Sequence, residues 1–125
     1  LAQRLRGNAD RFDTLYRHSR MAIILLDRDG LVIDGNPAFD RCFGYQEGEV
    51  RGRPFSDLVD PADRAQVLED LRALHEGLAE AGTGERRLLG ADGTHLWARI
   101  LGSLVRDAEG QPDHVMLLLE DVAEA

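Results

Sequence analysis

The chain has 125 residues, 43% of them apolar and 30% charged, which is typical of one globular domain and excludes a wholly disordered chain. Its net charge of −8 repels phosphate groups, so we expect no nucleic-acid binding. The longest apolar runs, residues 21–26 and 115–119, are too short to cross a bilayer, so no direct membrane insertion is expected. A single cysteine cannot form an internal disulfide, which is compatible with a cytoplasmic setting. The chain begins at Leu1 without an initiator methionine, and we interpret it as a piece of a longer protein.

Residues 1–17 are predicted to form an amphipathic helix that flanks the domain proper, residues 18–125. Gly7 and Asn8 weaken its middle, so the helical pattern is strongest from Ala9 onward. The apolar stripe of this helix consists of Leu1, Leu5, Phe12, Leu15 and Tyr16.

A tight hairpin is predicted next. Asp29-Gly30 can adopt the positive φ that such a turn requires, and it separates two apolar strands at residues 22–27 and 31–35. Asn36 and Pro37 then suit the N-cap and the first position of a short helix over residues 37–43. Gly44 follows where a helix takes a left-handed cap.

The apolar stripe of this short helix consists of Ala38, Phe39, Cys42 and Phe43. Cys42 is therefore interpreted as a small buried hydrophobe. Helical turns are expected at residues 47–50 and 55–59.

A long helix is predicted from Pro61 to about Ala81, with Asp60 as its N-cap and Asp63 placed for a near capping box. Glycines 82 and 84 are expected to end it. One continuous face carries Val67, Leu68, Leu71, Leu74, His75 and Leu78.

Three strands complete the predicted fold, at residues 85–89, 94–106 and 114–122, joined by turns at Asp92-Gly93 and around Gly110. The last two strands are apolar on both faces, so each face of the sheet must be covered. We expect the helices at 37–43 and 61–81 to cover one face, and the N-terminal helix or a partner subunit the other.

Nearly the whole chain resembles a PAS domain, the sensory module of bacterial signalling proteins. The resemblance is carried by the motifs Ile24-Leu25-Leu26-Asp27-x-Asp29-Gly30, Asn36-Pro37-Ala38-Phe39, Phe43-Gly44-Tyr45, Glu49-Val50-x-Gly52-Arg53, Asp60-Pro61-x-Asp63, Asp92-Gly93-Thr94-x-x-Trp97, Val105-Arg106-Asp107-x-x-Gly110-x-Pro112 and Glu120-Asp121-Val122. The resemblance implies the α+β PAS fold, with a five-stranded antiparallel sheet, short helices and one long helix over one face. It also implies a cavity that binds a small molecule in some relatives.

The function implied by the resemblance is a sensory module of a larger bacterial signalling protein. The module would sense a small ligand or a redox state and mediate homodimerisation, and it would control an output domain beyond residue 125. A histidine kinase, a cyclic-dinucleotide enzyme and a phosphatase all fit that role, and the cytoplasmic module could belong to a membrane-anchored parent. Two alternatives are a ligand-free protein–protein interaction module and a haem- or flavin-bound redox or gas sensor. Because the histidines have no metal-ligand spacing and no phosphate-cradling motif occurs, the segment is expected to be neither catalytic nor metal-binding.

Two sets of candidate site residues follow. The expected cavity lining is Phe39, Phe43, Phe55, Leu58, Leu71, His75 and Ile100, although an apolar stripe can equally fill a core. The expected outer sheet face, or dimer face, consists of Leu5, Phe12, Leu15, Tyr16, Trp97 and Leu101.

Two residues, His75 and Phe55, bear on whether the domain holds haem or forms a flavin adduct. An imidazole at His75 could ligate haem iron, but the absence of other haem-pocket signatures favours a hydrogen-bonded or partly exposed core histidine. Relatives that form a cysteinyl-flavin adduct carry the cysteine in a motif that would fall on residues 52–57. Phe55 stands at the cysteine's place, so this photochemistry is not expected.

Overall fold

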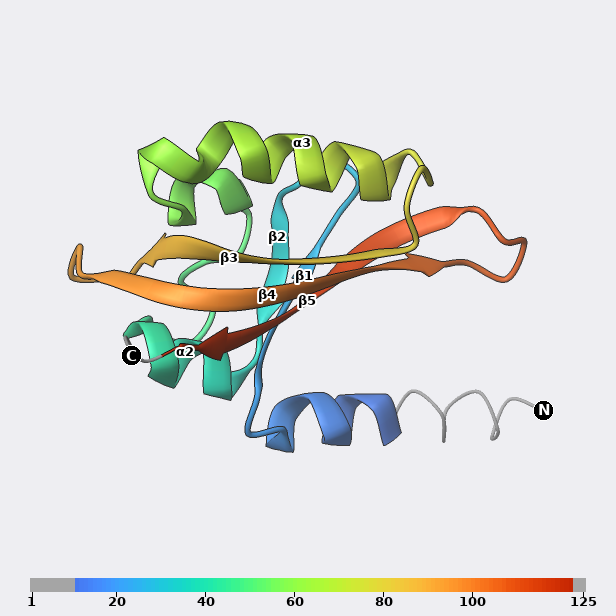
Figure 1. Ribbon diagram of the computed structural model, residues 1–125. Helices are drawn as coiled ribbons and strands as arrows, with labels where there is room; N and C mark the ends of the chain where they lie inside the picture. The colour runs from blue at the N-terminus through green and yellow to red at the C-terminus, as the bar shows by residue number, and fades with distance from the viewer. Residues whose placement is uncertain (1–10, 123–125) are drawn as a thin grey trace.

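The computed structural model describes residues 11–122 and contains one five-stranded antiparallel sheet in the order β2-β1-β5-β4-β3 (Figure 1). The α+β PAS fold expected from the sequence is therefore confirmed. The elements are β1 (Ala22–Leu26), β2 (Val32–Gly35), α2 (Pro37–Phe43), the 3-10 helices η1 (Phe55–Leu58) and η2 (Pro61–Asp63), α3 (Arg64–His75), β3 (Ala81–Leu89), β4 (His95–Arg106) and β5 (Pro112–Asp121). Residues 11–18 form a further helical segment, which we call the N-terminal helical segment.

The β1–β2 hairpin and α2 follow the prediction. Gly30 has a φ of 79° in the turn, and the Asp27 carboxylate accepts hydrogen bonds from two main-chain N–H groups of the same turn. The Asn36 side chain accepts from the Phe39 N–H at the start of α2, and Gly44 ends the helix with a φ of 80°. These signals are local, which is why the sequence reveals them.

Cys42 is exposed, so its interpretation as a buried hydrophobe was wrong. The short helix α2 turns Ala38, Phe39 and Phe43 into the protein, whereas Cys42 lies on the rim of a surface groove shared with the β3–β4 turn. Asp40 takes the fourth buried place on α2.

The long helix ends at His75, six residues before the predicted end. Gly77 has a φ of 73°, and the Leu78 N–H donates to the Ala73 oxygen at 2.9 Å, which closes a Schellman motif. Leu78 therefore lies outside the helix and is exposed, as is Leu68. The helical face that packs on the sheet is Val67, Leu71 and Leu74.

Asp63 does not complete a capping box. Its carboxylate accepts a hydrogen bond at 2.9 Å from the main-chain N–H of Arg87 in β3, and it thereby joins the start of the helix to the sheet. Asp60 does cap as expected, since its side chain accepts from the Ala62 N–H. Residues 47–52 form hydrogen-bonded turns and not a helical turn.

β3 begins at Ala81, earlier than predicted, and pairs with β4 along its whole length. Gly82 and Gly84 belong to this strand and do not terminate a helix. Gly82 lies opposite Gly102 of β4, so two glycines face each other across the β3–β4 ladder.

The core lies between α3 and one face of the sheet, and α2 contributes Phe39 and Phe43 to it. Alternate residues of the central strands point into this core, among them Ile24, Leu26, Ala98, Val115, Leu117 and Leu119. The N-terminal helical segment lies on the opposite side of the sheet from α3 (Figure 1). Of the helices within residues 11–122, none is long and apolar enough to cross a membrane.

Candidate ligand-binding site

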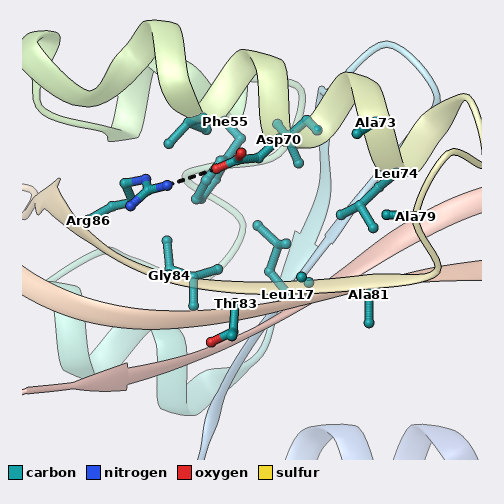
Figure 2. A pocket seen from close by; sticks show the side chains of 15 residues that line it. Phe55, Asp70, Ala73, Leu74, Ala79, Ala81, Thr83, Gly84, Arg86 and Leu117 are labelled. Carbon is teal, nitrogen blue, oxygen red and sulfur yellow. Dashed lines mark hydrogen bonds and ion pairs between the residues drawn. The ribbon is translucent and has the colours of Figure 1, made fainter.

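A cavity of about 200 Å³ lies between α3 and the core face of the sheet (Figure 2). α3 forms its roof with the side chains of Leu71 and Leu74, and Phe55 of η1 also lines it. The other lining residues come from α3, the α3–β3 connection and the three C-terminal strands: Val67, Asp70, Ala73, Ala79, Ala81, Gly82, Thr83, Gly84, Arg86, Ile100, Gly102 and Leu117.

Glycines leave room on the floor of this cavity. A Cβ added at Gly82 would meet no atom within 4 Å, so the space above this residue is open. At Gly84 a Cβ would lie 3.1 Å from Nη1 of Arg86. The missing side chain at Gly84 therefore lets the Arg86 guanidinium lie back along β3.

An ion pair between the two walls lies at the edge of the cavity. Nη2 of Arg86 in β3 lies 2.9 Å from Oδ2 of Asp70 in α3, as the dashed line in Figure 2 marks. The Arg86 side chain is 24% exposed and that of Asp70 is 50% exposed. Oδ1 of Asp70 accepts a second hydrogen bond, from the Gln66 side chain. The pair thus joins helix and strand where the apolar cavity meets solvent.

The predicted cavity residues divide into two groups. Phe55, Leu71 and Ile100 do line the cavity. Phe39, Phe43 and Leu58 are buried in the core outside this lining, and His75 at the end of α3 does not line it either.

Aromatic side chains fill the space beside α2. The rings of Phe39 and Tyr45 stack with their centroids 5.9 Å apart, and Phe43 packs at 4.9 Å from Phe39. The Tyr45 hydroxyl donates to the Leu89 carbonyl oxygen at 2.9 Å, which fixes the ring. The open space is consequently displaced toward the other end of the sheet, under α3.

The cavity does not fit haem or a flavin nucleotide. The cavity volume of about 200 Å³ is below the ~300–1,000 Å³ of pockets that hold drug-sized ligands. Haem and flavin nucleotides are large among such ligands, so the cavity is too small for either. His75 is half-buried, and its Nε2 atom has no hydrogen-bond partner among the described residues. Because His75 lies outside the lining, no imidazole is aimed into the cavity.

Asp70, Arg86 and the glycines were missed as site residues. The signal was present as alternation in Gly82-Thr83-Gly84-Glu85-Arg86, which places the two glycines and the arginine on one face of a strand. Because glycines 82 and 84 were interpreted as the end of a helix, the strand that begins at Ala81 was not predicted there.

The second predicted set is divided between β4, which carries Trp97 and Leu101, and the N-terminal helical segment, which carries Phe12, Leu15 and Tyr16. Phe12, Leu15, Trp97 and Leu101 are 40–72% exposed. Tyr16 is instead buried at 6% exposure. Its hydroxyl donates to Asp34 at 3.0 Å and so attaches the N-terminal helical segment to β2, while Leu5 lies outside the described residues.

Asp40 is a buried carboxylic acid on α2. Burial, followed by the negative charges of Asp34 and Glu47, raises the pKa of Asp40 to about 6. Its Oδ1 atom has no hydrogen-bond partner within residues 11–122. In the same part of the chain, no three His, Cys, Asp or Glu side chains are grouped to hold a metal ion.

A family model of the PAS fold matches residues 10–122. The chain belongs to the PAS family. A solved PAS domain from Colwellia psychrerythraea superimposes on this PAS domain with a TM-score of 0.84 at 21% identity, over 94% of this chain and 98% of that one.

Two curated relatives are large signalling proteins. The chain is 29% identical over 96% of its length to the sensor histidine kinase TmoS of Ectopseudomonas mendocina, and 28% identical over 90% to the probable diguanylate cyclase DgcE of Escherichia coli. It spans only 12% and 10% of those two proteins. The similarity thus concerns one sensory domain within much longer chains.

Proposed function

We propose that this PAS domain senses a small molecule in the cavity under α3 and transmits its binding to an output domain of the same chain. The observation that carries the proposal is the open space above Gly82, roofed by apolar residues of α3. A ligand there touches both a helix and the sheet. It can therefore favour one of two packings of helix on sheet, which is the thermodynamic requirement of a sensor.

The cavity proposal is tested by filling the cavity. A valine at Gly82 would place its Cβ where no atom lies within 4 Å, and Gly82 has no positive φ to lose. Native mass spectrometry and thermal melting against a metabolite library compare the wild type with Gly82→Val. We expect at least one compound to raise the Tm of the wild type alone. If every compound that stabilises the wild type stabilises Gly82→Val equally, the cavity is not the sensing site.

We also infer that a second copy of this domain covers the outer sheet face. Trp97 and Leu101 of β4 are 40% and 42% exposed on this face, and Leu15 of the N-terminal helical segment is 72% exposed. Arg99 lies between the two β4 residues and pairs with Glu85 and Glu120, so the face combines apolar area with both charge signs. A surface of this kind is suited to a symmetric homodimer.

The dimer proposal is tested with Leu15→Asp, and Leu78→Asp is its matched control. Leu78 is 69% exposed and closely follows α3, the helix on the other side of the sheet (Figure 1). Analytical ultracentrifugation is expected to show weakened association for Leu15→Asp and unchanged association for Leu78→Asp. A wild type that stays monomeric at high concentration would contradict the proposal.

The second candidate function is a ligand-free interaction module, which the packed rings of Phe39, Phe43 and Tyr45 favour. A cavity that admits no compound, combined with a dimer that depends on Leu15, would support it. A histidine kinase or diguanylate cyclase output, as in the two relatives, is proposed for the parent protein, with this domain in the cytoplasm.

A further inference from the structure

We propose that the ligand is a small aliphatic carboxylate whose oxygens pair with Arg86 and whose apolar tail lies beneath α3. This inference rests on the proposed sensing of a small molecule and adds its chemical class. The inference rests on the hydrogen bonds that the Arg86 guanidinium donates and on its Nε donor, which has no acceptor among the described residues.

Arg86 is not saturated with acceptors. Its Nη1 donates to the Glu85 carbonyl oxygen at 2.8 Å, and its Nη2 donates to Asp70 at 2.9 Å. Its Nε is buried and has no acceptor within residues 11–122. Buried donors are nearly always paired, and the Nε and Nη2 donors of arginine match the two oxygens of a carboxylate. An anionic acceptor of that shape would supply the partner that Nε does not have among the described residues.

Asp70 has no corresponding need for a cation. Each of its two carboxylate oxygens already accepts a hydrogen bond, one from Gln66 and one from Arg86. Asp70 is also half-exposed and can be solvated by water. The group without a partner at the cavity is consequently a donor, so a ligand that supplies an acceptor is favoured, and an anion fits better than an amine.

The remaining lining determines the tail of the ligand. Leu71, Leu74, Ile100 and Leu117 surround the space with aliphatic groups, and Gly82 leaves the floor open. A volume of about 200 Å³ holds a short branched chain and excludes a long fatty acyl chain. Carboxylate and tail together describe a small aliphatic acid.

The same geometry couples binding to the fold. Arg86 belongs to β3 and Asp70 to α3, and their ion pair joins the two elements. A ligand carboxylate competes with Asp70 for Arg86, so α3 loses one of its attachments to the sheet when the ligand binds. Binding is thereby converted into a change of helix position.

The test uses 3-methylbutanoate as the probe and 3-methylbutanamide as its uncharged match, titrated by calorimetry and by amide NMR. We expect saturable binding of the carboxylate with shifts in α3 and β3, and at least tenfold weaker binding of the amide. Arg86→Met should weaken the carboxylate at least tenfold, and Gly82→Val should abolish binding while the protein still melts cooperatively. Arg41→Met removes an exposed arginine of α2 that does not line the cavity, and it should leave the affinity for 3-methylbutanoate unchanged.

Amide binding as tight as carboxylate binding, or equal affinity in Arg86→Met, would overturn the proposal. So would a wild type that does not bind 3-methylbutanoate, whether or not it binds 3-methylbutylamine. If native mass spectrometry instead finds a neutral compound that the wild type retains and Gly82→Val does not, the carboxylate class is wrong while sensing at the cavity stands.

Discussion

The side-chain nitrogen of Asn36 lies 2.9 Å from the main-chain oxygen of Tyr16, the last buried residue of the N-terminal helical segment. The same nitrogen donates to the Met21 oxygen, and the side-chain oxygen accepts from the N–H groups of Ile23 and Phe39. This fully buried amide thus joins the N-terminal helical segment, β1 and α2 through four hydrogen bonds.

Asn36→Asp is expected to destabilise the domain by about 3 kcal/mol. The carboxylate keeps the two acceptor roles but loses both donors, and it places a charge against two carbonyl oxygens. Asp27→Asn is the matched control, since Asp27 only accepts hydrogen bonds and an amide oxygen still does so; its expected cost is about 0.5–1 kcal/mol. Urea denaturation measures both, and equal costs would contradict this assignment.

Tyr16→Phe is expected to cost about 1–2 kcal/mol, because the hydroxyl donates to the Asp34 carboxylate at 3.0 Å. The loss should loosen the N-terminal helical segment before the sheet. Hydrogen exchange would then accelerate at residues 11–18, and in β5 only at amides whose exchange requires global unfolding. Uniform acceleration along the whole chain would mean that the segment is an integral part of the core.

Asp40→Asn is expected to stabilise the protein at pH 7 by about 1–2 kcal/mol. The pKa of Asp40 is raised to about 6 in the folded state, above its unfolded value, so folding favours the protonated form. The native aspartate therefore costs stability as pH rises from about 4 to about 6, and the cost is complete above pH 6. Thermal melts should show the wild type and Asp40→Asn converging below pH 4. A gap that does not depend on pH would refute a titration effect.

Gly35→Ala and Gly82→Ala are expected to have opposite effects. A Cβ at Gly35 would lie 2.9 Å from Cδ1 of the Phe39 ring, which is held by its neighbours, so the expected cost is about 1–3 kcal/mol. A Cβ at Gly82 meets nothing within 4 Å and restricts the unfolded chain, so a gain of about 0.5–1 kcal/mol is expected. Guanidinium denaturation of both variants checks the sign of each change.

The parts of the fold that were predictable are those with local signals. The β1–β2 hairpin and α2 were predicted within about one residue, because Gly30, Asn36 and Gly44 act on their immediate neighbours. The end of α3 was not, because Leu78 continues the apolar period past Gly77 and concealed the cap. The Arg86–Asp70 pair could not be predicted, since it depends on how α3 lies over β3 and no sequence period records that placement.

The register of β1 on β5 has a mechanical consequence. Ala22, the first residue of β1, lies opposite Leu119 near the end of β5, so the chain enters and leaves the sheet on neighbouring antiparallel strands at one end. A force that draws residues 20 and 122 apart therefore acts across the strands and not along them. It would open the β1–β5 hydrogen bonds one after another, starting at Ala22, and single-molecule pulling from these two points would find that the sheet yields at low force.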